Sequence, residues 1–116
     1  MENALLDILI LGLLVLVLFV LTFLATPIFS GVSRHFEHQA DQYGLEVVHG
    51  LVPDEPHTTA EAFQILGEVS LDYPYVGKFW EFWAWDHPTI RDRMIFVQAY
   101  NPWAEGKQPE FVKNAP

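Results

Sequence analysis

The pattern of apolar and polar positions divides the chain into a long apolar segment and a more polar remainder. Residues 8–33 carry no charged side chain, and residues 8–25 are apolar apart from Gly12 and Thr22. A helix over residues 8–25 would be about 27 Å long, close to the thickness of the hydrocarbon core of a bilayer. Because backbone polar groups in hydrocarbon need partners within the chain, we expect a single transmembrane helix here.

A cleaved signal peptide and a buried helix of a soluble protein are the alternatives for this segment. A signal peptide carries positive charge before its apolar core, whereas Glu2 and Asp7 precede the run here and no Lys or Arg does. The run is also longer than a signal-peptide core. We therefore favour a membrane helix, with residues 1–29 as the span and its flanks. Arg34 follows the span, and the positive-inside rule then favours a cytoplasmic location for the remainder.

Beyond the apolar run, the spacing of apolar residues predicts further helices and no strand. Apolar residues recur at helical spacing over residues 28–48, so we expect a helix that leaves the membrane and ends before Gly50. A proline-containing loop follows over residues 51–57. Thr58 and Glu61 then match a capping box, which predicts the start of a second helix. The apolar face of that helix is expected to consist of Ala62, Phe63, Ile65, Leu66 and Val69.

Two shorter helices and a tail complete the predicted architecture. The dense aromatic stretch over residues 75–85 predicts a short helix. Pro88 is expected at the first position of a last helix, which covers residues 89–100. Residues 101–116 hold three prolines and are predicted to be a tail. The fold class is therefore all-α, with residues 30–100 as a small helical part that follows the transmembrane helix.

The aromatic stretch itself allows two interpretations. Its large side chains either form a lid packed on the other helices, which we favour, or lie at the membrane interface, where tryptophan is enriched. The side chains concerned are Phe79, Trp80, Phe82, Trp83 and Trp85.

Composition and charge exclude several classes of function. The chain has 6 Lys+Arg and 15 Asp+Glu residues and a formal net charge of −9, so it lacks the basic surface of a nucleic-acid-binding protein. It has no cysteine, which excludes disulfides, thiolate zinc ligands and a cysteine nucleophile.

Two carboxylates lie one helical turn apart after the apolar run. On a helix Glu37 and Asp41 share one face, and Arg34 falls on the same side. One carboxylate of such a pair can ligate a metal while the other orients a second ligand. The alternative, which spacing alone favours, is a solvated acidic face with an Arg34–Glu37 ion pair. His35 and His38 are three residues apart, and we expect them to be solvated rather than metal ligands.

A second polar group lies at the start of the last predicted helix. His87 and Pro88 precede that helix, and Arg93 follows six residues after the histidine. Taken alone, this group indicates only a histidine at a helix N-terminus, followed by surface arginines.

Taken together, in this order after a membrane helix, the two groups resemble the C-terminal part of the membrane zinc metallopeptidases. That family includes the type I CAAX prenyl proteases and the HtpX heat-shock proteases. Its helix leaving the membrane carries S-R-x-x-E-x-x-A-D, and the matching residues here are Ser33, Arg34, Glu37, Ala40 and Asp41. Its H-P segment, with an arginine six residues on, is matched by His87, Pro88 and Arg93. The resemblance covers about residues 11–97.

The resemblance implies a role for each of four residues. Glu37 would be the third ligand of a His₂Glu zinc site, and Asp41 would orient a ligand histidine or assist proton transfer. His87 and Arg93 would contact the substrate or the developing oxyanion. Such a site hydrolyses peptide bonds with zinc-activated water and a glutamate general base. The implied partners are the lipid bilayer and a peptide or membrane-protein substrate.

One departure from the family is serious. The H-E-x-x-H motif, which supplies the other two zinc ligands and the general base, does not occur in this sequence. Because catalytic zinc needs three protein ligands, we expect this chain to act as a C-terminal fragment with little activity alone. The alternative is a non-enzymatic, single-span membrane protein that serves as a subunit or adaptor. A zinc site shared among several copies of the chain is less favoured.

Overall fold

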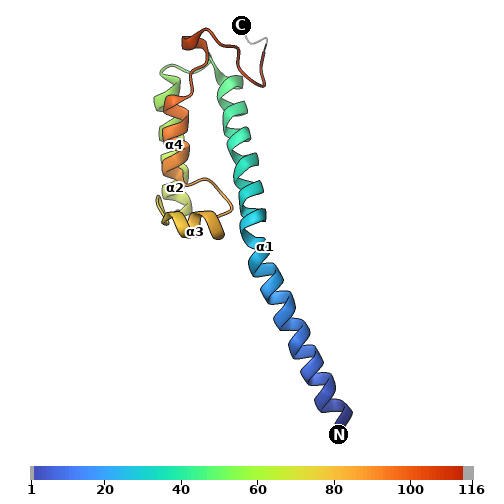
Figure 1. The fold of residues 1–116 in the computed structure, drawn as a ribbon. Helices are drawn as coiled ribbons and strands as arrows, with labels where there is room; N and C mark the ends of the chain where they lie inside the picture. The colour runs from blue at the N-terminus through green and yellow to red at the C-terminus, as the bar shows by residue number, and fades with distance from the viewer. Residues whose placement is uncertain (1, 114–116) are drawn as a thin grey trace.

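A single long helix organises the molecule. The computed structural model describes residues 2–113, and those residues form helices, turns and loops without any strand. α1 (Glu2–Val48) runs unbroken through 47 residues, with Pro27 inside it, and the other elements gather along its C-terminal half (Figure 1). The molecule is accordingly elongated, at 75 × 30 × 21 Å. The all-α fold and the continuation of the apolar helix into the helical part are confirmed.

The apolar half of α1 is uncovered by the rest of the chain. Every large apolar side chain from Leu5 to Leu24 is between 44% and 67% exposed. By length and composition α1 is a candidate membrane span. Within the described residues, the rest of the chain does not bury this helix.

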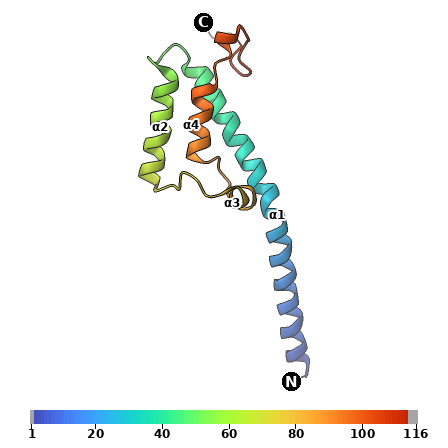
Figure 2. The same ribbon diagram turned by 60° about the vertical axis from the view of Figure 1, so that its left-hand side comes forward.

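Three shorter helices lie on one side of the polar half of α1 (Figures 1 and 2). α2 (Glu55–Ser70) packs chiefly on α4 (Ile90–Ala99), and α4 packs on α1. α3 (Lys78–Trp83) lies across α1 near its middle, in both views (Figures 1 and 2). The turn η1 (Trp103–Glu105) lies at the opposite end, beside the C-terminus of α1.

The core between these helices is small. Leu45 of α1, Ala60 of α2 and Val97 of α4 are buried together, and partly buried side chains surround them. The surrounding side chains are Phe63, Met94, Phe96 and Tyr100. A Cβ atom on Gly67 would lie 3.0 Å from Cγ1 of Ile90, so the glycine allows α2 and α4 to approach closely.

The apolar face predicted for α2 is largely wrong. Ile65, Leu66 and Val69 are 53%, 47% and 78% exposed, and only Phe63 of the predicted set packs on the core. The buried residues of α2 are instead the small ones, Ala60 and Gly67. Small side chains bring α2 against α4, and this turns the larger apolar residues outward.

The predicted starts of α2 and α4 also need correction. α2 begins at Glu55 rather than at Thr58, whose hydroxyl donates to the Pro53 carbonyl instead of capping the helix. The first turn of a helix tolerates proline, so the prolines there did not delay it. In α4 the N-cap is Thr89, whose hydroxyl accepts a hydrogen bond from the Asp92 amide at 3.2 Å. Pro88 therefore precedes the helix instead of occupying its first position.

The segment predicted to be a tail folds back onto α1. The backbone amides of Glu110, Phe111 and Val112 donate to the carboxylate of Glu46. The Trp103 ring stacks on His49, with ring centroids 3.4 Å apart. Residues 101–113 are thus fixed against the end of α1, and the remaining part of the predicted tail, 114–116, lies outside the described residues.

Candidate functional site

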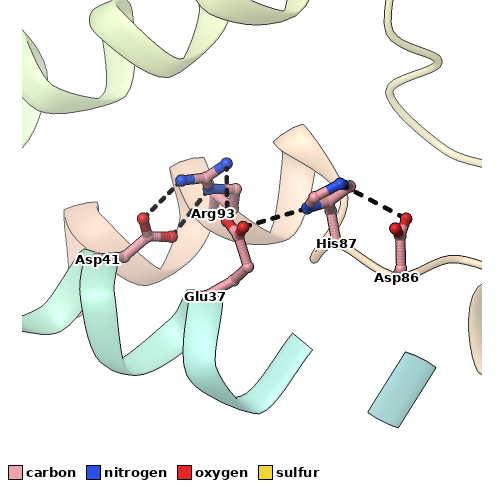
Figure 3. Close-up of polar contacts among 5 residues, drawn as sticks. All are labelled: Glu37, Asp41, Asp86, His87 and Arg93. Atoms are coloured by element: carbon pink, nitrogen blue, oxygen red, sulfur yellow. Dashed lines mark hydrogen bonds and ion pairs between the residues drawn. The ribbon is translucent and has the colours of Figure 1, made fainter. Parts of the chain in front are cut away.

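α1 and α4 bring the two polar groups of the sequence together. Figure 3 shows Arg93 of α4 above Glu37 and Asp41 of α1, with His87 beside Glu37. Arg93 donates from Nε and Nη2 to the two carboxylate oxygens of Asp41, at 2.8 and 2.6 Å. Its Nη1 lies 3.7 Å from Glu37, and His87 Nδ1 lies 3.2 Å from the other oxygen of Glu37. All four predicted site residues therefore form one cluster.

The cluster changes from buried to open along α1. The side chains of Asp41 and Arg93 are 7% and 14% exposed, whereas those of Glu37 and His87 are 34% and 55% exposed. The Arg93 guanidinium also lies 4.2 Å from the centre of the Phe63 ring, a cation–π contact. The Asp41–Arg93 pair is thus the fixed part of the site, and Glu37 and His87 form its accessible edge.

An open groove of about 420 Å³ runs along this face of α1. Its lining consists of Ser33, Phe36, Glu37, Ala40, Asp41 and Arg93. Four of the five matched residues of the first motif are in that lining, because spacings of three and four place them on one face of the helix. The arrangement leaves room beside Glu37 for another part of a protein or for a substrate.

Arg34, the fifth matched residue, has a different contact from the one predicted. It donates to the backbone carbonyls of Glu81 at 2.7 Å and of Phe82 at 3.4 Å, and also to that of Trp85. The Arg34–Glu37 ion pair of the alternative interpretation, a solvated acidic face, is therefore wrong. The physical reason is that the last carbonyls of a short helix lack intrahelical partners and attract a guanidinium. Arg34 fixes α3 against α1.

The described residues do not by themselves make a zinc site. Within residues 2–113 no three side chains of the ligating types are grouped so that they could hold a metal ion. His38 packs against the ring of Phe96 at 4.2 Å, away from Glu37. Glu37 is thus an accessible carboxylate at the edge of the groove, and the described residues do not add the further ligands that a zinc ion needs.

Sequence spacing did not single out Glu46, although it is the most buried carboxylate of the described residues. Its side chain accepts hydrogen bonds from the Tyr100 hydroxyl and from three backbone amides. Burial acts to raise the pKa of Glu46, but these hydrogen bonds outweigh it and the pKa lies below the ordinary value. For Tyr100, burial and the contact with Glu46 raise the pKa to about 12. Sequence spacing holds no signal for such a site, because most of its donors are backbone groups.

The uncovered apolar helix and the Glu-Asp-His-Arg cluster belong to a chain of a known peptidase family. The chain belongs to peptidase family M48, whose family model matches residues 4–101. The resemblance seen in the sequence is thereby confirmed.

One curated relative is described as an uncharacterized metalloprotease, YhfN, of Bacillus subtilis (strain 168). It is 33% identical over 88 residues, which are 76% of this chain and 20% of the relative. The chain thus spans about a fifth of the length of that relative. No solved structure matches the chain.

Proposed function

We propose that this chain forms the C-terminal portion of a membrane-anchored zinc metalloendopeptidase and contributes Glu37 as one zinc ligand. The observation that carries the proposal is the cluster itself. In a chain of peptidase family M48, Glu37 lies at the edge of an open groove and its two oxygens face Arg93 and His87. A buried carboxylate–arginine pair beneath it fixes that geometry.

Each residue of the cluster has a part in this proposal. Glu37 is the accessible carboxylate that binds the metal, and zinc supplies a Lewis acid and an activated water when it is bound. Asp41 holds Arg93 through both of its oxygens, so it orients the guanidinium at the groove. Arg93 and His87 lie where they can contact a peptide substrate or stabilise a developing oxyanion. The H-E-x-x-H ligands and the general base are contributed from outside this sequence.

The apolar half of α1 anchors this site to a membrane. Residues 8–25 cross a bilayer. The part of the chain that follows the span faces the cytoplasm by the positive-inside rule. The substrate is a peptide or a membrane protein, and the net charge of −9 disfavours nucleic acid as a partner.

A chimera tests the metal-binding role of Glu37. The related metalloprotease YhfN serves as the host, and its matching 88 residues are replaced by the corresponding residues of this chain. We expect the purified chimera to hold about one zinc ion per molecule and to cleave a casein substrate in a chelator-sensitive way. Glu37→Gln should lose most of the zinc and the activity, whereas Glu61→Gln, an exposed control on α2, should retain both.

A folded chimera that keeps its zinc and its activity in the Glu37→Gln variant would overturn the proposed ligand role. The 116-residue chain alone, purified in detergent, should hold less than about 0.1 zinc ion, since it offers one ligand. A stoichiometric ion in that preparation would show that several copies build the site together. A chimera that folds without zinc would favour the non-enzymatic alternative.

A further inference from the structure

Large aromatic side chains lie exposed on α3. Phe79, Trp80 and Phe82 are 63%, 58% and 59% exposed, although each carries more apolar surface than most residues of the core. A lid packed on the other helices would bury them. The lid interpretation holds only for Trp83 and Trp85, which are partly buried.

Two contacts with α1 fix the position of α3 along the long helix. The Trp83 ring lies 4.8 Å from the ring of Phe23, which belongs to the apolar run and stands two residues before its end. Phe79 stacks on Trp83 with the ring centres 6.0 Å apart. Closer to the polar half of α1, Arg34 donates hydrogen bonds to the backbone carbonyls of Glu81 and Phe82. α3 therefore lies where the apolar surface of α1 gives way to polar residues (Figures 1 and 2).

The charges around α3 differ from those of the molecule as a whole. Three of the six Lys and Arg residues line one cavity of about 480 Å³ beside α3, in a chain whose net charge is −9. Its full lining is Arg34, Tyr75, Lys78, Glu81, Phe82, Arg91 and Asp92. Basic side chains next to exposed tryptophan and phenylalanine are typical of segments at a membrane–water interface.

We propose that α3 lies flat on the bilayer surface, with its exposed aromatic side chains among the lipid headgroups and the upper acyl chains. This rests on the membrane span proposed for residues 8–25 and is independent of zinc. The surface is continuous with the apolar face of the span through the Phe23–Trp83 contact, which is why a bilayer fits it. The contact fixes the depth of α1, so that Glu37, twelve residues beyond Ala25, stands about 18 Å above the hydrocarbon.

Single-tryptophan variants of the full chain test this placement. One variant keeps Trp80 and the other keeps Trp103, which lies at the far end of the molecule, while the remaining tryptophans become phenylalanine. Trp83→Phe is a mild change because the buried Nε1 of Trp83 has no hydrogen-bond partner among the described residues. Both variants are reconstituted into vesicles of phosphatidylcholine and phosphatidylglycerol that carry acyl-chain bromine. We expect the Trp80 emission to fall by more than about half and the Trp103 emission to stay nearly constant.

Flotation and circular dichroism separate the possible failures. If the chain floats with the vesicles but Trp80 is unquenched, α3 does not touch lipid, and the inference fails while the span stands. If the Trp80 emission is blue-shifted but unquenched, the inference also fails, and another part of a protein covers α3. A helical chain that does not float overturns the span and the inference together.

A second measurement avoids the tryptophan changes. Since the chain has no cysteine, a spin label at Phe79→Cys occupies a unique site, and Ile95→Cys on α4, with 51% exposure, is the matched control. The label at 79 should be relaxed by oxygen more than by a water-soluble nickel complex, and the label at 95 should show the reverse. Equal behaviour at the two positions would overturn the inference.

Discussion

Arg93 is the side chain on which the geometry of the cluster depends most. Its guanidinium contacts Asp41 through two hydrogen bonds, approaches Glu37, and lies against the ring of Phe63. A planar fork with several donors can make all of these contacts at once, which a lysine ammonium cannot do. Removing one partner of the nearly buried pair leaves an uncompensated charge, and this is more costly than the loss of an exposed ion pair.

We therefore expect Asp41→Ala to lower the free energy of unfolding by about 3 kcal/mol. Glu37→Ala, at the accessible edge of the same cluster, should lower it by less than about 1 kcal/mol. Urea unfolding in detergent, followed by near-ultraviolet circular dichroism, measures both. The double variant Asp41→Ala/Arg93→Met should recover part of the loss, because it leaves no unpaired charge in the nearly buried part of the cluster. Similar losses for Asp41→Ala and Glu37→Ala would contradict this division of roles.

The Glu46 contact predicts a pH-dependent attachment of the C-terminal segment. The pKa of Glu46 is lowered in the folded chain, so its stabilising effect is present above its ordinary value of 4.5 and is lost as the pH falls through the folded value below that. The pKa of Tyr100 is raised to about 12, so its contribution is present below 10.0 and is lost as the pH rises toward 12. A spin label at Lys113→Cys should be immobile between these limits and mobile outside them.

Glu46→Gln is the control for the acidic limit. A neutral amide accepts backbone hydrogen bonds less strongly than a carboxylate does, so the label should be more mobile at neutral pH and lose its acidic transition. An acidic transition that persists in Glu46→Gln would assign it to another group.

Among the elements, the ends of α2 show what the sequence could and could not predict. Periodicity placed a helix there, but its start was wrong because the Thr58–Glu61 pattern resembled a capping box. The structure instead begins the helix after Asp54, which adopts a left-handed conformation with φ 47°. A capping pattern shows only that a local hydrogen bond is available, and tertiary contacts decide whether it forms. The C-terminus of α2 likewise has a leucine, Leu71, in a left-handed conformation where glycine is usual.

Leu71→Gly is accordingly expected to stabilise the chain. Leu71 has φ 55° and is 89% exposed, so glycine would relieve the backbone conformation and sacrifice almost no buried surface. We expect the free energy of unfolding to rise by about 1 kcal/mol. Leu71→Ala retains the Cβ atom and should leave stability nearly unchanged in the same urea titration. A stabilisation by alanine equal to that by glycine would assign the effect to side-chain removal instead.

At the scale of the whole molecule, the sequence predicted the elements better than the contacts between them. The apolar run and the all-α class followed from the spacing of residues. The family motif singled out Glu37 and Arg93, which the structure brings close together. The docking of Arg34 on α3 and of residues 110–112 on Glu46 did not, because in both cases a side chain binds backbone groups far away in sequence. Periodicity records which face of a helix is apolar, but it does not record which carbonyl or amide will lack a partner.

Because α1 is continuous from the apolar run to the site, the two parts of the helix should differ in their access to water. Gly12 lies within the run and Gly44 lies beyond the cluster, and neither would place a Cβ atom within 4 Å of another group. Cysteine at either position is therefore a mild change in a chain that otherwise has none. In vesicles, a membrane-impermeant maleimide should label Gly44→Cys when it is on the exposed side and should leave Gly12→Cys unlabelled, since position 12 lies in hydrocarbon. After detergent solubilisation and unfolding, both should react fully. Rapid labelling of Gly12→Cys in intact vesicles would show that α1 does not cross the bilayer, whereas the side on which Gly44→Cys reacts gives the orientation of the site.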